Sequence, residues 1–148
     1  MSTKPITWNK ERPATQIIPT FRYILKDNPT ITAVGLKVMF PPGASSPPHR
    51  HGTANVIAQV IEGSCTSGMN DDEPGIYGEG EHWYEAPGCY HRISDNASDT
   101  ERAVLLVTFV IETKILEEHG LGVLVQVEPE YLEGAIEQMA RCGFSIPQ

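Results

Sequence analysis

Three of the five histidines in this chain are spaced in a way that suits a metal site. His49 and His51 are separated by one residue, and His91 follows later in the chain. Side chains at alternate positions of a β-strand point to the same side of the sheet, so the first two imidazoles can share one ion. We therefore predict that His49, His51 and His91 bind one divalent metal ion. Three protein ligands leave coordination positions open, as a catalytic site needs.

Glycine and proline residues frame both histidine segments at regular distances. In chain order the frame residues are Gly43, His49, His51 and Gly63, and then Gly80, Pro87, Gly88, His91 and Asn96. This arrangement, over about residues 35–111, resembles the two signature motifs of the cupin family. The resemblance implies an all-β fold, the cupin-type double-stranded β-helix or jelly-roll barrel.

The resemblance also implies a cofactor and a chemistry. The cupins that have a three-histidine site include iron dioxygenases, in which the substrate binds the metal through two heteroatoms and O2 takes the remaining place. Fe(II) is therefore the favoured ion. Imidazole ligands by themselves suit Zn, Ni, Mn or Cu as well, so the residues do not name the metal.

One motif position departs from the family pattern. Where the family usually has a metal-binding glutamate, this chain has Val56, with Asn55 beside it. Three neutral imidazoles would leave a divalent ion its full charge, so we expect an anionic or chelating small-molecule substrate. Asn55 could instead offer its amide oxygen as a weak fourth ligand, the alternative being a turn residue.

The segment before His91 predicts further site residues. His82 and Tyr84 alternate with Trp83 and Glu85, so only one of these pairs can face a pocket. We favour His82 and Tyr84, with Tyr84 hydrogen-bonding the substrate and His82 acting as general acid or base. The alternative places the four residues on the outer face or in an interface.

Other polar residues near the motifs are not assigned to catalysis. Cys89 is expected to be a buried, inert thiol. Arg50 and Arg92 each adjoin a predicted ligand, and strand alternation turns them away from the ion, towards surface or subunit contacts. His119 is followed by glycine and is expected in a turn or at a helix end.

Short apolar runs separated by glycine, proline and aspartate predict an all-β sandwich or barrel. The longest run, over residues 102–112, is expected to be a central strand. The predicted strands span residues 21–26, 31–40, 55–61, 64–69, 75–77, 82–85, 90–94, 102–112 and 123–127.

The two ends of the chain differ from this pattern. Residues 1–20 are predicted to form an irregular arm with a short edge strand around residues 16–18, and residues 21–127 the barrel. Residues 128–148 are predicted to form a C-terminal α-helix and tail, because Pro129 suits a first helical position. The apolar face of this helix would contain Leu132, Ala135, Ile136 and Met139.

Composition excludes several classes of partner. The chain has 148 residues, which suit one domain, and 11 basic against 19 acidic residues give a net charge of −8. Without a basic cluster, nucleic acid and anionic membranes are poor partners. Neither a long apolar run nor a secretory signal is visible, so we expect a cytoplasmic protein with reduced cysteines. The resemblance and the apolar helix face suggest a homodimer.

Three classes of function fit these observations. A non-haem iron dioxygenase comes first, because a three-histidine site leaves room for substrate and O2 together. A decarboxylase, dehydratase or isomerase would use the same ion as a Lewis acid without redox chemistry. A barrel that binds or senses a small molecule without turnover is the third.

Overall fold

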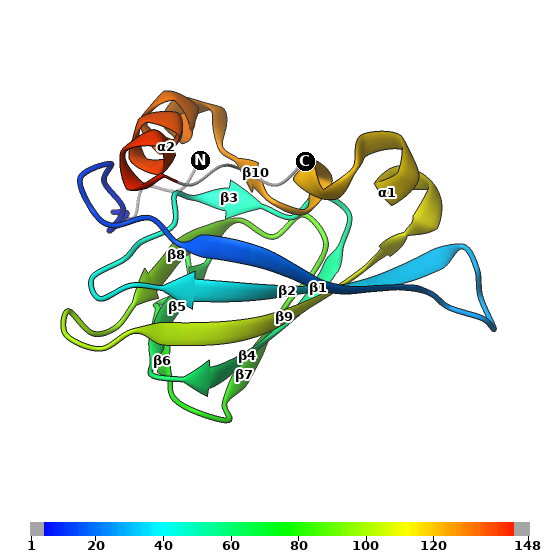
Figure 1. Ribbon diagram of the computed structural model, residues 1–148, viewed down its shortest axis with the longest axis horizontal. Helices are drawn as coiled ribbons and strands as arrows, with labels where there is room; N and C mark the ends of the chain where they lie inside the picture. Colours follow the sequence, from blue (N-terminus) through cyan, green and yellow to red (C-terminus); the bar gives the residue numbers. More distant parts are fainter. Residues whose placement is uncertain (1–4, 144–148) are drawn as a thin grey trace.

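The alternating apolar and polar runs form strands that pair into two antiparallel sheets (Figure 1). The computed structural model describes residues 5–143, so the first residues of the predicted arm and the end of the predicted tail, 144–148, lie outside the described residues. In spatial order the first sheet contains β1 (Gln16–Ile24), β2 (Ile31–Phe40), β9 (Ala103–Glu112), β4 (Asn55–Glu62) and β7 (His82–Glu85). The second contains β10 (Gln126–Val127), β3 (His49–Arg50), β8 (His91–Asn96), β5 (Cys65–Met69) and β6 (Gly75–Tyr77). The predicted jelly-roll fold with a C-terminal helix is confirmed.

Strand β9 lies in the middle of the first sheet, as its long apolar run predicts. It pairs with β2 on one side and β4 on the other. Its alternate residues Leu105, Val107 and Phe109 are buried and face the barrel interior, where they line a cavity. The core therefore surrounds this cavity.

The N-terminal strand is longer than predicted. Strand β1 runs from Gln16 to Ile24, so the predicted edge strand at 16–18 and the predicted strand at 21–26 belong to one element. Its register with β2 shifts between Pro19 and Phe21, which accounts for the apparent break in the sequence pattern. The strand forms the edge of the first sheet, where a proline is tolerated.

The segment after β9 contains two short helices that the sequence analysis missed. These are α1 (Thr113–His119) and the 3-10 helix η1 (Leu121–Leu124). Helix η1 takes up the first two residues of the strand predicted over residues 123–127, of which only β10 is observed as a strand. Leu116 and Leu124 are buried and attach this segment to the core. His119 lies at the end of α1, as expected.

Helix α2 (Pro129–Cys142) begins at the predicted proline, but its buried face differs from the prediction. Leu132 and Ile136 are exposed, whereas Ala135 and the polar Gln138 are buried. Gln138 is buried because its amide accepts a hydrogen bond from Trp8 Nε1 and donates to carbonyl groups of the N-terminal segment. Helices α1 and α2 both lie on the side of the barrel formed by β3 and β10 (Figure 1).

None of the helices between residues 5 and 143 combines the length and apolar character needed to cross a membrane.

Candidate metal centre

Neighbouring strands of the second sheet bring the three predicted histidines together. His49 on β3 is the register partner of His91 on β8, and His51 follows directly after β3. The loop after β3 and the loop before β8 are also joined, because the Gly88 N–H donates to the Gly52 carbonyl at 3.0 Å. All three rings are buried, and each offers a nitrogen within 4.8 Å of those of the others.

Backbone carbonyls orient two of the rings. His49 Nδ1 lies 2.7 Å from the Pro47 carbonyl and His51 Nδ1 lies 2.6 Å from the Leu124 carbonyl. A carbonyl accepts but cannot donate, so each Nδ1 carries the proton. The lone pair of each ring is then on Nε2, and such carbonyl contacts are the usual support of metal-binding histidines.

His91 is oriented differently from the other two rings. Its Nε2 is hydrogen-bonded to Ser67 Oγ at 2.9 Å, and its Nδ1 faces a carboxylate, Glu85, at 3.5 Å. Ser67 comes from β5, the strand that pairs with β8. The second sheet therefore supplies both the ring and the hydroxyl group that fixes it.

The predicted orientation of β7 is wrong. His82 and Tyr84 are exposed on the outer face, whereas Trp83 and Glu85 are buried and line the cavity. Burial of the indole decides the orientation, because it places a large apolar surface in the core and turns the alternate residues outward. The sequence contained this signal, since tryptophan is better suited than histidine to a buried position. His82 and Tyr84 therefore do not line this cavity.

Glu85 is the functional candidate that the sequence analysis missed. Its Oε1 lies 3.3 Å from His51 Nε2 and 3.5 Å from His91 Nδ1. Its Oε2 accepts a hydrogen bond from Trp83 Nε1 at 3.1 Å. The indole thus holds the carboxylate with its other oxygen directed at the imidazoles. We call His49, His51, His91 and Glu85 the donor cluster.

The donor cluster contains three buried polar atoms that have no hydrogen-bond partner. Over residues 5–143, His51 Nε2, His91 Nδ1 and Glu85 Oε1 are the buried side-chain atoms left in this condition. A buried polar atom without a partner typically costs about 1–3 kcal/mol. Two imidazole nitrogens and one carboxylate oxygen that point to one place are a set of ligands for a divalent cation. The residues present therefore fit the metal that the motifs imply.

The protonation states of the donor cluster also suit metal binding. Burial, and then the neighbouring His51 and His91, lower the pKa of His49 well below its ordinary value. Burial likewise lowers the pKa of His91, although Glu85 acts in the opposite direction. Burial opposes ionisation of Glu85, but its interactions with His91 and His51 outweigh this effect and lower its pKa. The lowered pKa values of His49 and His91 favour their neutral forms, which can bind a cation without first losing a proton.

The donor cluster opens onto a cavity of about 90 Å³ with mostly apolar walls. Polar groups besides the donor cluster come from Thr15, Ser46 and Ser94, and the described lining contains no lysine or arginine. Other lining residues are Ile17, Leu36, Val38, Phe40, Ala58, Trp83, Leu105, Val107, Phe109, Val125, Val127, Ala135 and Met139, with Pro47 beside the rings. Helix α2 and the N-terminal segment thus contribute to the wall together with the barrel.

Residues considered around the motifs lie outside this cavity lining. The side-chain amide of Asn55 accepts a hydrogen bond from the exposed Tyr84, so it is not directed at the donor cluster. Arg50 pairs with Glu128 at 2.7 Å and lies over the ring of Tyr90. Cys89 is half-buried rather than buried, and burial raises the pKa of its thiol, in agreement with the predicted inert role.

Arg92 was expected to be turned away from the metal, in surface or subunit contacts; it does lie outside the cavity lining, but it is not at the surface. The side chain is buried, and its guanidinium donates to the carbonyls of Asn70, Pro5 and Asp72. It therefore ties the N-terminal segment to the loop after β5. This contact is a structural one, since no atom of Arg92 lines the cavity.

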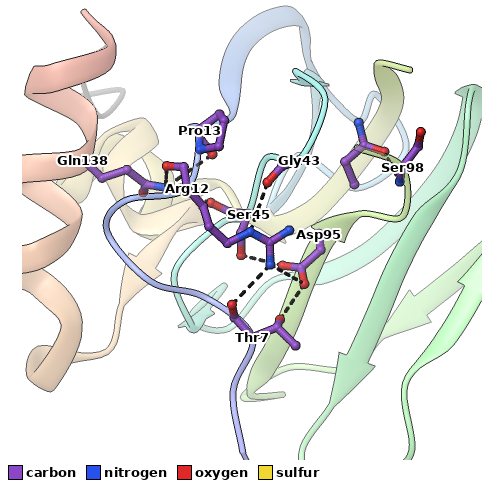
Figure 2. A network of polar contacts seen from close by, with 9 residues as sticks. Thr7, Arg12, Pro13, Gly43, Ser45, Asp95, Ser98 and Gln138 are labelled. Carbon is purple, nitrogen blue, oxygen red and sulfur yellow. Dashed lines mark hydrogen bonds and ion pairs between the residues drawn. The ribbon is translucent and has the colours of Figure 1, made fainter. Parts of the chain in front are cut away.

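A second buried polar cluster lies on the same strand as His91. Asp95 of β8 accepts hydrogen bonds from Ser45 and Thr7, and Arg12 pairs with it at 3.3 Å (Figure 2). Arg12 also donates to the Gly43 carbonyl at 3.0 Å. We call Thr7, Arg12, Ser45 and Asp95 the Asp95 network. It fastens the N-terminal segment to the barrel.

Comparisons with known proteins agree with the geometry. The family described as a Cupin domain matches residues 36–109. An RmlC-like cupin family protein from Methanocaldococcus jannaschii has a TM-score of 0.55 at 20% identity, covering 79% of this chain and 98% of that chain. TT1209 from Thermus thermophilus has a TM-score of 0.54 at 20% identity, covering 65% of this chain and 82% of that chain. A recombinant oxalate oxidase in complex with glycolate has a TM-score of 0.54 at 18% identity, covering 87% of this chain and 69% of that chain. No curated protein matches the sequence.

Proposed function

This chain belongs to the cupin family, and from that premise we propose that it is a metal-dependent enzyme, a non-haem Fe(II) dioxygenase that acts on a small chelating molecule. The observation that carries the proposal is the donor cluster, whose unpartnered atoms face a cavity with apolar walls. His49, His51 and His91 would hold the ion. Iron in such a site supplies the one-electron chemistry that lets an organic molecule react with O2.

The charges around the cavity define the class of substrate. Glu85 offsets one of the two positive charges of a divalent ion, so the site is less positive than three neutral imidazoles alone would make it. The described lining provides no further cation. A chelating monoanion, such as the enolate of a 1,3-diketone or the mono-deprotonated form of an ortho-dihydroxy compound, would bring the buried charges to balance. We propose this class in place of the more highly charged acids that neutral ligands alone would favour.

The walls of the cavity would bind the remainder of the substrate. Phe40, Val107 and Phe109 offer apolar surface, which stabilises a hydrocarbon group by about 25 cal/mol for each Å² removed from water. Met139 of α2 and Ile17 of β1 contribute to the same lining from the two ends of the chain. These walls would also exclude water from the reacting atoms.

A non-redox lyase or isomerase is the second candidate, and Glu85 is the observation that favours it. An ionised carboxylate oxygen without a hydrogen-bond partner, at the cavity wall, can accept a substrate proton at Oε1. In this case the ion would act as a Lewis acid only. The two candidates differ in whether O2 is consumed.

The test is oxygen uptake by protein that has been loaded anaerobically with Fe(II). The panel contains 1,3-diketones and ortho-dihydroxy aromatic compounds, together with oxalate and glycolate because a similarly folded oxalate oxidase was solved with glycolate. We expect consumption of O2 and transfer of both labelled oxygen atoms from ¹⁸O2 into the product of a monoanionic chelator. Turnover without O2 uptake would support the lyase or isomerase, and binding without turnover would contradict both.

We also propose that the protein is cytoplasmic and forms a homodimer. The homodimer is tested by sedimentation velocity at micromolar concentration. A single species with the mass of one chain would contradict it.

A further inference from the structure

Strands β4 and β7 bring Glu85 next to the position where the first motif would have a glutamate. The strands are antiparallel, and Val56 is the register partner of Glu85. Opposed residues of an antiparallel pair point to the same face, with Cβ atoms about 4.5–5.5 Å apart. Val56 and Glu85 are 1% and 2% exposed, so both side chains face the barrel interior. A carboxylate on either strand can therefore reach the same region.

The carboxylate of Glu85 is already directed at the imidazoles. One oxygen is held by the indole N–H of Trp83, and the other faces nitrogens of His51 and His91 at 3.3 and 3.5 Å. The second oxygen has no hydrogen-bond partner, which is costly for a buried polar atom. A cation between this oxygen and the ring nitrogens would supply a partner for all of them.

We propose that Glu85 is the fourth protein ligand of the metal ion, supplying from β7 the carboxylate that Val56 does not supply from β4. The inference rests on the metal site proposed above. Trp83 is a positioning residue, because it holds Oε2 and leaves Oε1 for the ion. The metal site of this chain would thus contain three histidines and one carboxylate. The carboxylate would come from β7, not from the neighbouring strand β4.

The experiment moves the carboxylate back. Wild type, Glu85→Val and the double variant Glu85→Val/Val56→Glu are prepared without metal, and Co(II) affinity is measured by competition with a chelator. We expect Glu85→Val to weaken binding at least about tenfold, and the double variant to recover most of this loss. Equal affinity of wild type and Glu85→Val would overturn the inference, as would a folded double variant that binds no better than Glu85→Val.

Cobalt spectroscopy separates a ligand from a residue that only orients His51. Glu85→Gln preserves the shape of the side chain but replaces the charged oxygen. We expect the visible absorption of bound Co(II) to change in band position and intensity, because the ligand set changes. An unchanged spectrum would overturn the inference.

Two controls keep the outcomes distinguishable. If His51→Ala also leaves Co(II) affinity unchanged, the metal site itself is wrong, whereas loss in His51→Ala without loss in Glu85→Val removes only the role of Glu85. Circular dichroism and thermal unfolding of the metal-free variants report folding. Glu85→Val is expected to fold, because it replaces an unpartnered buried charge with an apolar side chain.

Discussion

The donor cluster and the Asp95 network share strand β8, with His91 in one and Asp95 in the other. The carboxylates of the two clusters differ in how fully they are hydrogen-bonded. Asp95 is hydrogen-bonded through both carboxylate oxygens, to Ser45 on one and to Thr7 and Arg12 on the other (Figure 2). Glu85 has one oxygen without a partner. Both carboxylates are buried. The difference teaches that one cluster is fully hydrogen-bonded within the chain, whereas the other leaves polar atoms free to bind a ligand.

The two clusters should therefore respond oppositely to substitution and to metal. Loss of a residue from the Asp95 network should reduce stability and leave metal binding intact. Loss of a residue from the donor cluster should reduce metal binding with a smaller effect on the metal-free fold. The four predictions below test this contrast.

Asp95→Ala should have the largest effect. It removes the acceptor shared by Thr7, Ser45 and Arg12, and breaking a buried charged contact costs about 3 kcal/mol in the free energy of unfolding. Urea denaturation of the metal-free protein measures it, with the exposed Asp99→Ala as a matched control. A loss of Co(II) affinity comparable to that of His51→Ala would abolish the contrast.

His51→Ala should weaken Co(II) binding at least about 100-fold, which corresponds to about 2.7 kcal/mol. The reason is that Nε2 of this ring is a donor atom with no partner in the protein. Chelator competition measures the affinity. His82→Ala is the matched control, because His82 is exposed on the outer face of β7 and should bind as wild type does.

Metal should stabilise the wild-type protein by a moderate amount. At a free concentration ten times the dissociation constant, binding adds about 1.4 kcal/mol. For a chain of this size the midpoint of thermal unfolding should rise by about 3–6 °C and return after chelation. In Asp95→Ala the metal should raise the midpoint of thermal unfolding by the same amount, from a lower value in the metal-free protein. In His51→Ala the metal should leave the midpoint unchanged under these conditions.

Acid should weaken the metal-free donor cluster. The folded-state pKa of His49 lies well below the ordinary value of 6.5, so the unfolded chain binds more protons as pH falls below 6.5. The contribution of His49 is complete above that pH and is lost on acidification, by about 1 kcal/mol between about pH 6.5 and 5.5. Urea denaturation across this range measures it. His49→Ala should flatten the dependence, and a stability that rises on acidification would contradict the assignment.

The sequence predicted those parts of the molecule that depend on local spacing. The strand over Ile31–Phe40 is observed with the predicted bounds, and α2 begins at Pro129 as its position in the chain indicates. The histidines converge because the motif spacing places them on paired strands. These features follow from residues close together in the chain or from a family resemblance.

The remaining features depend on pairing between distant segments. Glu85 enters the site because β7 pairs with β4 in a register that puts it opposite Val56, and periodicity alone left two orientations of β7 open. Burial of Gln138 depends on the N-terminal segment that binds it, so the apolar stripe predicted Ala135 and Met139 correctly but placed Leu132 and Ile136 on the buried face instead of Gln138. Tertiary contacts override local preference in both cases.

The central claim is that the donor cluster holds one divalent ion. Crystals of the protein grown with Co(II) and measured on both sides of the cobalt absorption edge test it most directly. We predict one anomalous peak per chain, within about 2.0–2.2 Å of a nitrogen of each of the three rings and an oxygen of Glu85. The absence of an anomalous peak among these side chains, or a peak that places the Co(II) ion elsewhere on the chain, would contradict the account.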